Sequence, residues 1–166
     1  PGHNIEMSVL LCPGLGQLGY VNMAATLAVA DTIAEITDLH PVIKWPNDVM
    51  IGGRKVSGIL IETTFNGTCP SYTVVGIGID VNFDPTEVPE LANTATSICL
   101  ETGLTTDRTE ILLALLIRLD DLYKAVKRGV SLTDQWVSKL DTIGQTIKVR
   151  WGDRIVEGLA QGVNEQ

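Results

Sequence analysis

The residue types best suited to chemistry occur together in the stretch KWPNDV at residues 44–49, which is followed closely by GRKVSGIL at residues 53–60. A cation, an amide and a carboxylate where two strands meet can hold a triphosphate and its magnesium, since Mg²⁺ prefers one or two protein oxygens together with substrate phosphates. Pro46 cannot serve a central ladder, so the motif is expected where strands separate. A polar turn around a buried Trp45 is the competing interpretation, and the residue types alone leave both open.

A second motif, GLGQLG at residues 14–19, fits the G-x-G-x-x-G pattern of dinucleotide-binding loops. Pro13 interrupts the strand-to-helix turn that such a site needs, and the segments that follow read as hairpins rather than as alternating β-α-β units. We therefore interpret this stretch as a glycine-rich connecting loop.

The elements that must position these residues follow from hydrophobic periodicity and turn residues. Residues 5–12 and 42–45 are of strand type, and the alanine-rich residues 21–36 predict a tightly packed helix. From Val49 onward, β-branched runs are separated by Gly52-Gly53 and by Asn66-Gly67. These dipeptides are typical of short hairpin turns, so the strands should pair antiparallel.

The C-terminal half is predicted to contain more helix. A short helix is expected to end at Gly103, and Asp107 followed by Glu110 predicts a capped helix start. An apolar stripe at helical spacing then indicates the surest helix of the chain; it comprises Ile111, Leu112, Leu115, Leu116, Leu119, Leu122, Tyr123 and Val126. Residues 132–140 predict a shorter helix, and residues 146–163 predict two or three strands of a small, unfinished β unit.

Composition narrows the class of protein. The 166 residues suffice for one compact domain, and 12 basic against 20 acidic residues give a formal charge of −8, which disfavours nucleic acid as a partner of this segment. Three widely spaced cysteines predict neither disulfides nor a zinc site, and no apolar run approaches the ~20 residues of a membrane helix. We therefore expect a cytoplasmic protein that does not contact the membrane.

KWPNDV followed by GRKVSGILIE closely resembles the motif pair of biotin protein ligases. PGHNIEMSVLL, VVGIGIDVNF, ATSI and TIGQTIKVRWGD resemble further segments of that family in the same order. The resemblance implies an α+β fold of the class II aminoacyl-tRNA synthetase/biotin synthetase type, with a mixed, largely antiparallel sheet flanked by helices. It also implies an N-terminally truncated catalytic domain at residues 1–141 and the start of an SH3-like β domain at residues 142–166.

The same resemblance implies a function. Such a ligase forms biotinyl-5′-AMP from biotin and ATP with Mg²⁺ and then transfers biotin to a lysine of a biotin carboxyl carrier protein. A lipoate-type acyl ligase shares the fold but lacks KWPNDV in this form, and a non-catalytic biotin-sensing or regulatory module is a further alternative. A homodimer is left open.

Site roles are carried over position by position. Lys55 matches the lysine that contacts the biotin carboxylate and the reacting α-phosphate, where positive charge offsets the approach of two anions. Asn47 and Asp48 match residues that hold the ATP phosphates and magnesium, and Asp48 is also a candidate to orient the acceptor amine. Lys44 either supports the phosphates or is structural.

The resemblance also implies a binding floor. Gly58, Gly76 and Gly78 fall inside strands, where glycine is unfavourable unless something approaches the backbone closely; a bulge or tight sheet packing is the alternative explanation. Leu60 joins this cofactor-binding set. Arg108 matches an arginine near the nucleotide, although its place in a first helical turn is also typical of a surface residue.

Two departures from the family pattern have consequences. Asp80 replaces the usual asparagine, and a second carboxylate near a triphosphate predicts weaker ATP binding or a greater need for magnesium. The family's glycine- and arginine-rich biotin loop is expected immediately before Pro1, so this segment alone is expected to adenylate biotin poorly. If the resemblance holds, Lys55 must lie on the same surface as Asn47 and Asp48, over a glycine-lined hollow.

Overall fold

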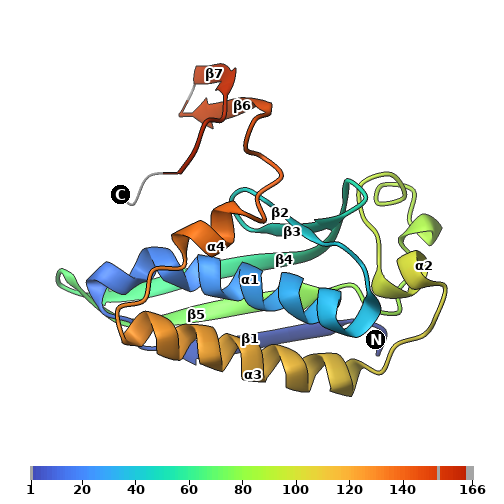
Figure 1. The fold of residues 1–166 in the computed structure, drawn as a ribbon, viewed down its shortest axis with the longest axis horizontal. Coiled ribbons are helices and arrows are strands. Elements are labelled where there is room, and N and C mark those ends of the chain that lie inside the picture. Colours follow the sequence, from blue (N-terminus) through green and yellow to red (C-terminus); the bar gives the residue numbers. More distant parts are fainter. Residues whose placement is uncertain (1, 153, 164–166) are drawn as a thin grey trace.

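The computed structural model describes residues 2–152 and 154–163, and its main feature is a five-stranded antiparallel sheet. The strand order is β1-β5-β4-β3-β2, which places β1 and β2 at the two edges (Figure 1). The strands are β1 (Ile5–Leu11), β2 (Val42–Lys44), β3 (Asp48–Ile51), β4 (Arg54–Asn66) and β5 (Cys69–Ile79). The antiparallel pairing expected from the sequence is confirmed.

Glycines in the left-handed region make the two long hairpins. Gly52 and Gly53, with φ of 56° and 78°, turn the chain from β3 into β4, and Gly67, with φ of 62°, turns β4 into β5. Residues that carry a side chain rarely adopt this backbone conformation without strain, which is why these glycines mark the turns in the sequence. The strand-to-strand hairpins also rule out a doubly wound dinucleotide fold for this sheet, as the sequence indicated.

Helices α1 (Leu18–Thr37), α3 (Arg108–Lys127) and α4 (Thr133–Val137) cover one face of the sheet (Figure 1). The core lies between these helices and the sheet, and the alanines at positions 24, 25, 28 and 30 are buried there, which lets α1 approach its neighbours closely. On the opposite face, Leu10 and Leu60 are each 61% exposed. That open face is where a ligand can reach the strands.

Helix ends follow the expected capping residues. The Asp107 carboxylate accepts a hydrogen bond from the Thr109 amide at 2.8 Å and begins α3, and α2 (Ile98–Thr102) ends at Gly103 with φ of 72°. The apolar stripe of α3 is narrower than expected, because Leu116 is 38% exposed. Short 3-10 helices, η1 (Leu15–Gln17) and η2 (Pro85–Glu87), complete the helical elements of the described residues.

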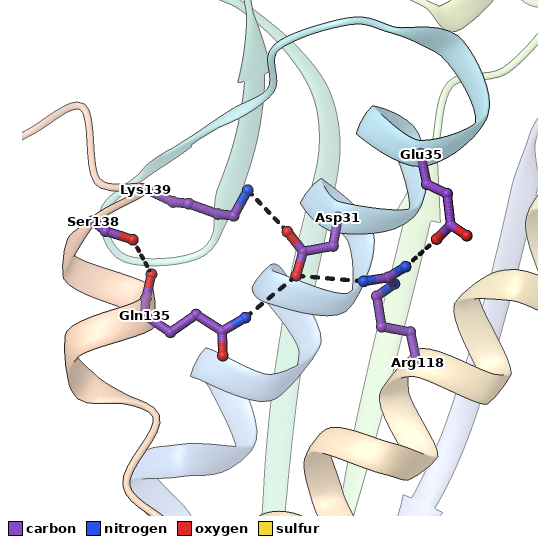
Figure 2. A network of polar contacts seen from close by, with 6 residues as sticks. All are labelled: Asp31, Glu35, Arg118, Gln135, Ser138 and Lys139. Atoms are coloured by element: carbon purple, nitrogen blue, oxygen red, sulfur yellow. Dashed lines mark hydrogen bonds and ion pairs between the residues drawn. The ribbon is translucent and has the colours of Figure 1, made fainter.

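A polar network joins the three helices that cover the sheet (Figure 2). Asp31 of α1 contacts Lys139 at 2.8 Å, Gln135 of α4 at 3.4 Å and Arg118 of α3 at 3.8 Å. Arg118 also pairs with Glu35 of α1. Because several charges share one partly buried node, the network fixes α4 and α3 against α1 more firmly than isolated surface pairs would.

The C-terminal segment forms a separate two-stranded antiparallel sheet of β6 (Thr146–Trp151) and β7 (Arg154–Leu159). It lies beyond α4 and outside the main sheet (Figure 1). The SH3-like character of this segment and the division into residues 1–141 and 142–166 stay predictions. Within the part of the chain that the structure describes, no helix combines the length and apolar content needed to cross a bilayer.

Candidate active site

Sheet register brings the chemistry-bearing residues into one row across the open face. Glu6 of β1 pairs with Gly78 of β5, Gly78 with Gly58 of β4, Gly58 with Asp48 of β3, and Asp48 with Lys44 of β2. Directly paired residues of antiparallel strands present their side chains on the same face. The row therefore reads carboxylate, two glycines, carboxylate and cation.

A second row lies beside the first and completes a hollow. Ser8 pairs with Gly76, and Gly76 pairs with Leu60. The hollow is a pocket of about 570 Å³, large enough for a small organic ligand. Its lining residues are Glu6, Met7, Ser8, Asn47, Lys55, Gly58, Ile59, Leu60, Gly76, Ile77 and Gly78.

The three glycines of the pocket floor, Gly58, Gly76 and Gly78, differ in what a side chain at each position would meet. A Cβ added at Gly58 would lie 2.8 Å from Lys55 Nζ, so a side chain at this position would push the end of the lysine side chain away from its present place over the strand. A Cβ at Gly78 would meet nothing nearer than the Gly58 carbonyl oxygen at 4.0 Å, and one at Gly76 nothing nearer than Leu60 at 3.7 Å. Internal packing therefore does not require the last two glycines, and side chains there would fill the pocket.

Lys55 lies where the sequence interpretation required it. Its ammonium forms an ion pair with Asp48, and its side chain is 45% exposed, so it is held yet accessible to a ligand. The Lys55 backbone is bound on both sides: its amide donates to the Thr94 carbonyl at 2.9 Å, and its carbonyl accepts from the Thr96 amide at 2.8 Å. The expectation that Lys55 shares a surface with Asn47 and Asp48 over a glycine floor is confirmed.

Asn47 is part of the pocket wall and of the turn that makes it. Its side-chain amide donates to the Ile59 carbonyl at 2.6 Å, and the Ile59 amide donates back to the Asn47 carbonyl at 3.0 Å. The turn of residues 45–47 joins β2 to β3, which places Pro46 outside the ladder. Trp45 is 50% exposed, so the competing interpretation of a turn around a buried tryptophan is wrong.

The oxygens of Asn47 and Asp48 suit magnesium. Among the described hydrogen bonds, the Asn47 side chain uses only its amide nitrogen, so its oxygen remains an acceptor. Asp48 contributes a carboxylate that is 25% exposed. No group of three His, Cys, Asp or Glu side chains suited to a metal gathers among the described residues. This donor set fits Mg²⁺ carried on phosphates rather than a cation held by protein alone.

Asp80 and Arg108 lie at one end of the pocket rather than in its lining. Arg108 lines a smaller adjoining pocket of about 260 Å³, which shares Glu6 and Met7 with the main one. Burial raises the pKa of the Asp80 carboxyl, the Lys55 charge counteracts this rise, and the Glu6 charge adds to it. Asp80 therefore shares the electrostatic environment of Lys55.

Lys44 is not brought to the main pocket. Lys44 pairs with Asp48 at the β2 end of the first row, and it lines a different cavity together with Trp45, Pro46 and residues of the C-terminal hairpin. The sequence interpretation in turn missed Glu6 and Ser8. Their signal was the polar alternation within IEMSVLL, but it acquires meaning only through the register that sets them opposite Gly78 and Gly76.

Comparison with known proteins supports this geometry. The family model of the biotin/lipoate A/B protein ligase family matches residues 6–80. The chain is 30% identical to the bifunctional ligase/repressor BirA of Bacillus subtilis over 99% of the chain and 52% of that protein. It is 29% identical to the biotin–[acetyl-CoA-carboxylase] ligase of Paracoccus denitrificans, over 99% of the chain and 72% of that protein.

A solved structure gives the same result. The biotin protein ligase of Aquifex aeolicus in complex with biotin and ATP superposes with a TM-score of 0.84 and is 32% identical, with 98% of this chain and 68% of that chain covered. The chain spans about half the length of the first curated relatives that it matches. Sequence, fold and pocket agree, and the chain belongs to the biotin protein ligases of the biotin/lipoate A/B protein ligase family.

Proposed function

We propose that the protein is an ATP-dependent biotin–protein ligase that forms biotinyl-5′-AMP and transfers biotin to a lysine of a biotin carboxyl carrier protein. The observation that carries the proposal is the ammonium of Lys55, which lies over the Gly58 floor beside Asn47 and Asp48. The similarity to a ligase whose structure holds biotin and ATP supports the choice of ligands.

In the first step, a carboxylate oxygen of biotin attacks the α-phosphorus of ATP, the bond from that phosphorus to the bridging oxygen breaks, and pyrophosphate leaves. Two anions must approach each other, so fixed positive charge at the reacting centre lowers the barrier. Lys55 supplies this charge, and Asn47 and Asp48 hold the phosphates with their Mg²⁺, which neutralises phosphate charge when bound.

In the second step, the amine of a carrier lysine attacks the acyl carbon of biotinyl-5′-AMP, the bond from that carbon to the phosphate oxygen breaks, AMP leaves, and the amine gives up a proton to solvent. Asp48 orients that amine and can accept a hydrogen bond from it, since its carboxylate is partly exposed at the pocket edge. The protein forms no covalent intermediate in this scheme. Its contribution is position and charge.

The floor provides the room for the vitamin and the adenylate. Gly76 and Gly78 leave the strand backbone open, and Leu60 offers an apolar surface beside them that is 61% exposed. Lining groups of both kinds suit biotin, which joins an apolar ring and chain to a polar ureido group. Asp80 and Arg108 act at the nucleotide end, where Asp80 makes binding depend on magnesium.

Isothermal titration with biotin, lipoate and MgATP, combined with pyrophosphate release and labelling of a carrier domain, tests the proposal in a polypeptide that also includes the glycine- and arginine-rich biotin loop. Binding of biotin and not lipoate, with pyrophosphate released and the carrier labelled, is the expected outcome. Preference for lipoate would assign the protein to the acyl-ligase alternative. Biotin binding without pyrophosphate release or labelling would instead indicate a sensing module.

A further inference from the structure

Asn4 connects three segments at the nucleotide end of the pocket. Its side-chain amide donates to Asp80 Oδ1 at 2.5 Å, and its side-chain oxygen accepts from the Val81 amide at 3.1 Å. Its backbone carbonyl accepts from Arg108 at 3.1 Å. One residue just before β1 thus holds the segment just after β5 and the first turn of α3.

Asp80 is near Lys55 without pairing with it. Burial raises the pKa of the Asp80 carboxyl and the nearby Lys55 charge opposes that rise, yet the ion-pair partner of Lys55 is Asp48. The Asp80 amide donates to the Val56 carbonyl at 2.9 Å, so the two backbones are directly adjacent. What restrains the Asp80 carboxylate on the β1 side is its short hydrogen bond from Asn4.

We propose that Asn4 is a positioning residue that holds the Asp80 carboxylate away from Lys55, so that the lysine remains free for the anionic groups of the substrates. This inference rests on the proposed function, because it concerns the availability of Lys55 to nucleotide and biotin. A carboxylate released from Asn4 is free to move toward the Lys55 ammonium, whose charge already acts on it, and a lysine shared by Asp48 and Asp80 binds a third anion less well.

The test is a double-mutant cycle in the 166-residue chain with Asn4→Ala, Asp80→Asn and the combination, read out as the Kd of MgATP by calorimetry. Asn4→Ala is expected to weaken MgATP about tenfold, the scale of one lost charge-assisted hydrogen bond. Asp80→Asn removes the competing charge from the nucleotide end and is expected to bind MgATP more tightly than the wild type. The combination is expected to bind as Asp80→Asn does.

The recovery of MgATP affinity in the combined variant distinguishes a positioning role of Asn4 from a structural role. Asn4→Ala and the combination both lose the acceptor for the buried Val81 amide, so a structural role makes both bind equally weakly. That result would overturn the inference while leaving the proposed function intact. A wild-type chain that binds no MgATP would instead remove the proposed function, and the inference with it.

A second pair covers the case in which Asn4→Ala does not fold. Asn4→Asp keeps an acceptor for the Val81 amide but sets a carboxylate against Asp80, which is expected to drive Asp80 toward Lys55 and weaken MgATP. Combining it with Asp80→Asn rebuilds an acid–amide hydrogen bond in the reverse order and is expected to restore wild-type affinity. Failure of this swap to restore binding would contradict the inference.

Discussion

Replacement of Lys55 by alanine separates catalysis from stability more sharply than any other change at this site. The lost interactions are the ion pair with Asp48 and the positive charge over the Gly58 floor. Because the two side chains are 45% and 25% exposed, solvent screens the pair, and we expect the free energy of unfolding to fall by about 1 kcal/mol or less.

The effect on the reaction is expected to be much larger. Loss of one preorganised charge at a reacting phosphate costs about 3 kcal/mol of transition-state stabilisation, which corresponds to a rate about 150-fold lower. Pyrophosphate release from MgATP and biotin measures this rate in a polypeptide that also includes the glycine- and arginine-rich biotin loop, and urea denaturation of the same samples measures the stability. A loss of transition-state stabilisation that exceeds the loss of unfolding free energy would identify Lys55 as a group that acts on the substrates.

Arg54→Ala is the matched control. Arg54 precedes Lys55 on β4 and also loses an ion pair when replaced, the one with Glu101 of α2 at 2.7 Å, with side chains 34% and 17% exposed. Arg54 does not line the pocket, so we expect a similar loss of stability with pyrophosphate release unchanged. If Lys55→Ala were as active as Arg54→Ala, the reasoning about the site would be refuted.

Three further changes probe the floor, the pocket end and the helix layer. Gly78→Val is expected to fold, because its Cβ has 4.0 Å of room, yet to abolish biotin binding in calorimetry by filling the pocket; unchanged affinity would contradict a floor role. Because the pKa of Asp80 is raised in the folded state, the folded protein binds the Asp80 proton more tightly than the unfolded chain does. The protonated carboxyl therefore stabilises the fold at low pH, and this stabilisation is lost as the pH rises from 3.8 through the pKa of the folded state. Asp80→Asn should therefore gain stability relative to wild type at neutral pH but not below pH 3.8 in denaturation curves, and a pH-independent difference would disprove this. Asp31→Ala removes the shared acceptor of Lys139, Gln135 and Arg118 and is expected to lower the unfolding free energy by about 1–2 kcal/mol without affecting MgATP affinity; a change in affinity would show that the network reaches the site.

The hairpins and the start of the longest C-terminal helix could be predicted from turn and capping residues in the sequence. The hairpins could be predicted because Gly52, Gly53 and Gly67 adopt backbone conformations that other residues resist, and the start of α3 could be predicted because the Asp107 side chain accepts from the free Thr109 amide. The site was predicted differently: the residue types of KWPNDV left a polar turn open as an alternative, and the resemblance of KWPNDV and GRKVSGILIE to the ligase motif pair decided for a binding site. The hairpin of β3 and β4 brings Asp48 and Lys55 close together in the structure.

The tertiary structure decided what the local chain could not. Whether a strand residue faces the helices or the open side depends on register between strands that lie far apart in sequence, and a slip by one residue would reverse every side chain. The pairing of β1 with β5 therefore decides that Glu6 and Ser8 line the pocket, and the pocket's limits decide that Lys44 does not. The bond from Asn4 to Asp80 spans 76 positions in the sequence, and no local pattern encodes a contact that exists only once the sheet is assembled.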